Sequence, residues 1–101
     1  MDFFAKQNEL GQKSAELREQ FEDNKVQFLL TELDTATTFC HVANSSSDPE
    51  KIKRNIAHAR EGYDTILQFR QDAVFDHESK REFNSKFAHL QSLLKDLGQT
   101  I

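Results

Sequence analysis

Three stretches of the chain place apolar residues at alternating intervals of four and three. An interval that averages 3.5 residues aligns side chains along one side of an α-helix. The three stripes are Leu29, Leu33, Ala36, Cys40 and Ala43; Ile52, Ile56, Ala59, Tyr63 and Ile66, continued by Arg70 and Ala73; and Phe83, Phe87, Leu90, Leu94 and Leu97. Three such helices joined by short polar loops can bury their stripes only against one another. The spacing therefore predicts an all-α fold with an antiparallel three-helix core bundle.

Capping residues indicate where these helices begin and end. Asp48 and Pro49 combine an N-cap side chain with the residue preferred at the first helical position. Asp76 is placed to cap the third helix, and Gly98 can adopt the left-handed conformation that ends it. The predicted core helices are residues 25–44, 49–75 and 77–97 of a single domain spanning residues 1–101.

Residues 1–24 are more polar than the core and carry only a thin apolar strip. Its members are Phe3, Leu10, Leu17 and Phe21. Because this strip is too narrow for a full core helix, it is the candidate interaction surface. The segment completes a four-helix bundle, forms a dimerising arm, or frays. Asn24 followed by Gln27 fits a capping box that would begin a new helix, whereas the seven-residue spacing of Phe21 and Phe28 allows one continuous helix. The sequence leaves both alternatives open.

Composition excludes several classes of function. The 101 residues carry a formal net charge of −4 and no basic stripe, so nucleic-acid binding is not expected. No window approaches 18 apolar residues and the first residues do not resemble a signal peptide, so neither a membrane span nor secretion is expected. The single cysteine is typical of a reducing compartment, and the predicted location is the cytoplasm.

The histidines and the cysteine do not form a known metal or catalytic pattern. Di-iron bundles need a Glu three residues before a His, but the four residues at those positions are Thr38, Asn55, Val74 and Lys86. Cys40 alone cannot build a thiolate zinc site, and its place in an apolar stripe is unsuited to a nucleophile. Glycine-rich phosphate loops and nucleophile-elbow motifs are missing from the sequence. We therefore expect no catalytic residue, no metal and no cofactor, no small-molecule substrate, and no enzymatic activity.

One histidine has a specific alternative interpretation. The segment from Ala57 to Gly62 resembles the motif of histidine phosphotransfer domains, in which an exposed His is followed four residues later by Gly. In this interpretation His58 would carry the phosphoryl group and Gly62 would let a receiver domain approach. The segment departs from that family at Glu61, where the family usually has Lys, and a carboxylate there repels a phosphoryl group.

The first two core helices also carry a resemblance. Residues 33–36 and 60–67 resemble small bacterial proteins of uncharacterised function built around one helical hairpin, and are loosely similar to tetratricopeptide and microtubule-interacting-and-transport hairpins. The tetratricopeptide opening and closing residues are missing. The resemblance implies a module that binds peptides or helices.

Aromatic residues outside the stripes point in the same direction. Phe39, Phe69 and Phe75 lie off or at the margin of the stripes. If these side chains and the N-terminal strip are exposed, they form a larger apolar patch than monomers usually show. We therefore expect a non-catalytic, bacterial, cytoplasmic interaction or scaffold protein that binds a protein partner or pairs as a homodimer.

Overall fold

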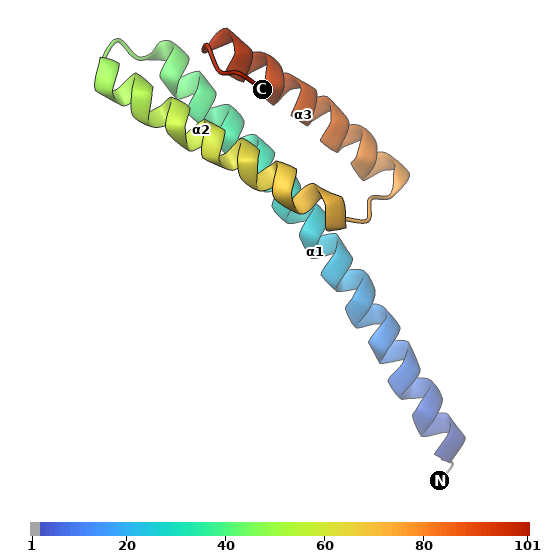
Figure 1. Ribbon diagram of the computed structural model, residues 1–101. Helices are drawn as coiled ribbons and strands as arrows, with labels where there is room; N and C mark the ends of the chain where they lie inside the picture. Colours follow the sequence, from blue (N-terminus) through green and yellow to red (C-terminus); the bar gives the residue numbers. More distant parts are fainter. Residues whose placement is uncertain (1–2) are drawn as a thin grey trace.

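The computed structural model describes residues 3–101, and their side chains from Lys13 onward. The elements are α1 (Phe3–Ser45), α2 (Pro49–Phe69), the short 3₁₀ helix η1 (Arg70–Asp72) and α3 (His77–Asp96). No strand occurs in this part of the chain, and successive helices run in opposite directions (Figure 1). The all-α prediction is confirmed.

Helix α1 runs without interruption for 43 residues. At 1.5 Å per residue it is about 65 Å long, and it accounts for most of the 71 Å length of the molecule. The capping box at Asn24 is not used, because α1 continues through this position. The described chain therefore has three α-helices, without a separate fourth helix from residues 1–24. Asp23 and Asn24 introduce neither Gly nor Pro, so nothing in the backbone forces a break.

The first half of α1 extends beyond the bundle as a single helix (Figure 1). Val26 is the first buried residue, and none of the side chains described before it is buried. We call residues 3–25 the arm. The core thus begins at Val26, three residues before the first predicted stripe at Leu29 and close to the predicted boundary at residue 25.

The core consists largely of the predicted stripes. All five residues of the first stripe are buried, with Leu33 completely enclosed. The second and third stripes bury the following residues: Ala59, Tyr63, Ile66, Phe83, Leu90 and Leu94. Ile52, Ile56, Phe87 and Leu97 are half-buried at the margins. Helices α2 and α3 both pack on the C-terminal half of α1.

Aromatic rings fill the space between α2 and α3. Tyr63 of α2 stacks on Phe87 of α3 with ring centroids 5.5 Å apart, and Phe87 stacks on Phe83 at 5.5 Å. Phe75, in the connection before α3, lies 4.9 Å from Phe83. Gln91 donates a hydrogen bond to the Tyr63 hydroxyl at 3.3 Å. The large rings hold these two helices together at a wider spacing than small side chains would.

The predicted helix caps at Asp48, Asp76 and Gly98 are present. Asp48 accepts a hydrogen bond from the backbone N–H of Glu50 at 3.1 Å. Asp76 accepts one from the backbone N–H of Ser79 at 2.7 Å, and this bond holds the pKa of the Asp76 carboxyl below its ordinary value. Gly98 has a φ of 86°, which a left-handed helix stop requires.

Helix α2 ends at Phe69, earlier than the predicted end at residue 75. The chain tightens into η1, and Ala73 then adopts an extended conformation with φ −84° and ψ 138°. This change of direction carries the chain across to α3 and places Phe75 against Phe83. Ala73 packs against the core in this extended conformation, so an apolar residue is favoured there although the helix has already ended.

The contrast between core and arm gives a test of the fold. Leu33→Ala should lower the free energy of unfolding by about 2–5 kcal/mol, because it leaves a cavity at a fully enclosed position. Leu17→Ala, the same change on the arm, should stay within about 0.5 kcal/mol because Leu17 is 66% exposed. Urea denaturation measures both, and an equal loss for the two variants would contradict this core.

Candidate functional site

A strip of large apolar side chains is exposed along the arm and the adjoining part of the bundle. Leu17 is 66% exposed, Phe21 59% and Phe28 45%. Their spacing of four and then seven residues places them on one side of α1. Phe69, at the end of α2, is 48% exposed and meets Phe28 edge to face, with ring centroids 5.9 Å apart. We call these four residues the apolar strip.

The strip ends in a hollow between α1 and the end of α2. The hollow has a volume of about 690 Å³ and is lined by Phe21, Asn24, Lys25, Phe28, Leu29, Phe69 and Asp72. Most of its lining atoms are carbon, and the buried Leu29 forms its floor. A hollow of this size accepts one or two bulky side chains of a partner.

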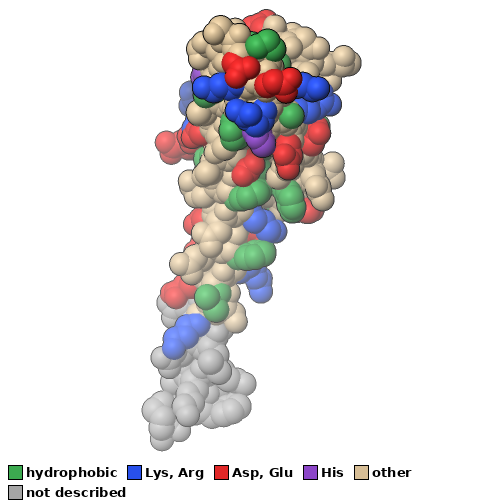
Figure 2. Space-filling view, turned by 90° about the vertical axis from the view of Figure 1, so that its left-hand side faces the viewer, with side chains coloured by type: hydrophobic (Ala, Val, Ile, Leu, Met, Phe, Trp, Pro, Cys, Tyr) green, Lys and Arg blue, Asp and Glu red, His purple; other side chains and the backbone are tan. Residues whose placement is uncertain are grey.

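Lys25 borders the strip. Its ammonium nitrogen lies 4.7 Å from the centre of the Phe21 ring, within cation–π range, and 3.6 Å from a Glu22 carboxylate oxygen. Figure 2 shows this face, with apolar side chains following one another toward the arm and Lys and Arg side chains beside them. The exposed surface is therefore apolar along its middle, with cations along the arm at its edges and with Asp72 at the hollow.

The opposite side of α1 is acidic. A wide groove of about 990 Å³ lies between α1 and the connection before α3. Its acidic members are Glu16, Glu19, Glu22, Asp23 and Asp76, and Arg18 is the one Lys or Arg side chain among its described lining residues. Val74, 66% exposed, is among its apolar members. The two sides of the arm thus differ in charge as well as in apolar character.

The predicted interaction residues fall into two groups. Leu17 and Phe21 are exposed on the arm, whereas the side chains of Phe3 and Leu10 lie outside the described residues.

Sequence reasoning missed Phe28 as a member of this surface, whereas it had named Phe69, together with Phe39 and Phe75, as an aromatic residue that would enlarge the patch if exposed. Phe69 is exposed, and Phe39 and Phe75 are half-buried. The spacing of Phe28 from Phe21 was a signal for Phe28, but only the packing of α2 on α1 places Phe69 beside it.

His58 and Gly62 have different surroundings in the structure. His58 is exposed, and its ring lies 5.0 Å from that of Phe39. Gly62 faces α1, where an added Cβ would lie 3.1 Å from the Cβ of Ala36. A small hollow beside them is lined by Glu32 and Glu61 without any Lys or Arg. Gly62 therefore serves the close packing of α1 and α2, and the carboxylates disfavour a phosphoryl group.

Cys40 lies in the core of α1 and is 1% exposed. Burial raises the pKa of its thiol, so the reactive thiolate form is disfavoured at neutral pH. These surroundings support the predicted role of Cys40 as a buried core residue and not as a nucleophile.

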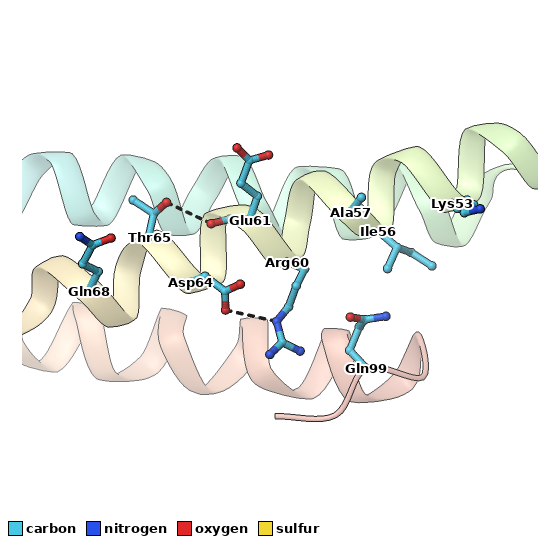
Figure 3. Close-up of a pocket in the computed structure, with 9 residues that line it drawn as sticks. All are labelled: Lys53, Ile56, Ala57, Arg60, Glu61, Asp64, Thr65, Gln68 and Gln99. Carbon is cyan, nitrogen blue, oxygen red and sulfur yellow. Dashed lines mark hydrogen bonds and ion pairs between the residues drawn. The ribbon is translucent and has the colours of Figure 1, made fainter.

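The outer side of α2 forms a shallow polar surface near the C-terminus, with a volume of about 590 Å³ (Figure 3). Arg60 donates hydrogen bonds to Asp64 at 3.2 Å and to the Thr100 carbonyl at 2.6 Å. Gln99 lines this surface from the C-terminal segment, across from Ile56 and Arg60. The guanidinium thus fastens the C-terminal residues to α2, and its charge is already shared with a carboxylate.

Metal-binding and membrane-spanning features are missing from the described residues. His41 of α1 and His89 of α3 come together with ring centroids 6.2 Å apart, a proximity that the sequence did not reveal. No group of three or more His, Cys, Asp or Glu side chains that could hold a metal occurs in the described part of the chain. None of its helices combines the length and apolar character needed to cross a bilayer.

Comparison with known proteins found no match: no protein-family model, no curated protein and no solved structure is significantly similar to this chain.

The packing role of Gly62 can be tested by enlarging it. Gly62→Leu should lower the free energy of unfolding by about 1–3 kcal/mol, because the new side chain would collide with Ala36. Ala57→Leu, at an exposed position of α2, should stay within about 0.5 kcal/mol. Thermal and urea denaturation measure both. Equal stability of the two variants would remove the case for a packing role.

Proposed function

We propose that this protein is a non-catalytic protein–protein interaction module and that the apolar strip with its hollow is the binding surface. The observation that carries the proposal is the exposure of Leu17, Phe21, Phe28 and Phe69 on one continuous face. Contiguous exposed apolar surface of this kind usually marks a binding site. The single cysteine supports a cytoplasmic setting.

The arm itself supports this proposal. A helix that packs on no other element lacks its main source of stability, because most helix stability in proteins comes from packing an apolar face. The strip on the arm is not covered by any other described helix. A partner that covers Leu17 and Phe21 would add the missing packing energy. An apolar helix face of this type is recognised by another helix or by a groove.

The proposal includes two kinds of partner. One is a second copy of this chain, which would make the arm a dimerising element, as the sequence predicts. The other is a different protein that the bundle recruits. In both cases the bundle holds the strip in place for binding. No covalent bond is made or broken.

The proposed binding surface can be tested with a displayed library of random peptides selected on the wild-type chain. Leu17→Ser/Phe21→Ser should lose at least tenfold in affinity for the selected peptides, because large apolar side chains dominate most interfaces. Glu16→Ser/Glu19→Ser, on the opposite side of α1, should bind them as the wild type does. Light scattering of the wild type and the strip variant shows whether a second copy is the partner. Failure to enrich any peptide, together with a monomeric wild type, would contradict the proposal.

Phosphotransfer through His58 is the alternative that the sequence raised, and the exposure of this residue keeps it testable. We expect no acid-labile label when the wild type is incubated with a labelled phosphodonor, because Glu32 and Glu61 surround the adjacent hollow. His58→Gln is the control. A label on the wild type that this substitution removes would replace the interaction proposal with phosphotransfer.

A further inference from the structure

We propose that the partner of the apolar strip is an amphipathic α-helix whose apolar side is flanked by Asp and Glu side chains. This inference rests on the proposed function, since it specifies the chemistry of the partner for the same surface. It is carried by the distribution of charge around the strip, which is independent of the apolar exposure that defines the site.

The charges of the arm are sorted by side. Successive residues of an α-helix are about 100° apart around its axis. On this measure the three cations between residues 13 and 28 lie within about 80° of the middle of the strip. They are Lys13, Arg18 and Lys25. The four anions of the same segment lie about 120° or more away. They are Glu16, Glu19, Glu22 and Asp23. The strip therefore has a basic border on both sides.

The contacts agree with this distribution. Lys25 extends over the Phe21 ring and remains partly exposed, so its ammonium group can reach a partner that lies on the strip. Lys13 and Arg18 are exposed. Most acidic residues of the arm line the groove on the other side of α1, where Arg18 also lies. Within the chain only Glu22 pairs with a cation of the border, at 3.6 Å from Lys25, so the border is only partly neutralised among the described residues. Carboxylates on a partner would complement the border and set its orientation.

A symmetric pair of arms is opposed by the same charges. In a parallel pair joined along the strip, Lys13 of one copy would face Arg18 of the other, since flanking residues five apart meet across such an interface. In an antiparallel pair, the residues on one side of the strip meet the residues on the same side of the strip in the second copy. The side that carries Arg18 and Lys25 would then face itself, which again places cation against cation. Like charges at flanking positions destabilise a helix pair, so a partner with acidic flanks fits better.

The shape of the surface favours a helix over a lipid bilayer. The strip leads into a concave hollow of about 690 Å³, which a protruding side chain of a helix can fill and a flat bilayer surface cannot. Asn24 lines this hollow. Its amide would lose hydrogen bonds in contact with lipid tails, whereas a protein partner can supply polar groups.

The inference can be tested with two synthetic helices, each about three heptads long with Leu along one side. They differ only in whether the residues flanking the Leu side are Glu or Lys. The full-length protein should bind the Glu-flanked helix about tenfold more tightly than the Lys-flanked helix. The preference should shrink when salt is raised from about 0.05 M to about 0.5 M, because surface charges are then screened. Calorimetric titration measures both affinities.

A charge-reversed variant provides the decisive comparison. Lys13→Glu/Arg18→Glu/Lys25→Glu should reverse the preference and bind the Lys-flanked helix more tightly. Lys51→Glu/Lys53→Glu/Arg54→Glu makes the same change in net charge at exposed positions of α2 and should keep the wild-type preference. Circular dichroism checks that both variants keep the helical content of the wild type.

The outcomes separate this inference from the proposed function. Equal binding of both helices, lost in Phe21→Ser, would overturn the acidic partner and leave the binding surface in place. Binding of neither helix would also overturn it, while the peptide selection decides the proposed function separately. Tighter binding to phosphatidylserine vesicles than to either helix would assign the strip to lipid. A dimer that Phe21→Ser dissociates would assign it to a second copy.

Discussion

The burial of one side of α1 between the other two helices is the interaction on which the structure depends. The residues of this stripe, from Leu29 to Ala43, are all enclosed. Helix α2 approaches closely where Gly62 meets Ala36, and α3 is linked by the hydrogen bonds of Lys86 to both carboxylate oxygens of Asp34, at 2.8 and 3.1 Å. Those bonds also raise the pKa of Lys86. Both neighbours are thus organised around one central helix.

The same helix supplies the arm, and this continuity links stability to function. Starting a helix is costly, whereas extending an existing one adds a hydrogen bond for each residue that is fixed. The packed half of α1 therefore provides the nucleus from which the arm extends. A surface held in its binding conformation loses less entropy when a partner binds. The bundle positions the strip, and Phe69 of α2 joins it only because α2 packs beside α1.

Residues that suggest chemistry in the sequence have structural roles in the fold. Cys40 is enclosed and its thiol is kept protonated by burial. Tyr63 stacks on Phe87 and accepts a hydrogen bond from Gln91. Gly62 allows two helices to approach closely. What remains on the surface is an apolar strip with a basic border, which is a means of recognition rather than of catalysis.

The sequence alone determined the helical class, the three buried stripes and the positions of the caps at Asp48, Asp76 and Gly98. These follow from local rules, because helix periodicity and capping depend on residues within one or two turns of one another. It also marked Leu17 and Phe21 as members of a strip. Only the tertiary structure decided that α1 continues through Asn24, that α2 ends at Phe69 and that Phe28 and Phe69 complete the strip around a hollow. The end of α2 and the completed strip depend on contacts between helices that are distant in sequence, and the spacing within a single helix carries no information about them. The continuation of α1 is an extension of its packed half, which supplies the helix nucleus that a local capping pattern does not account for.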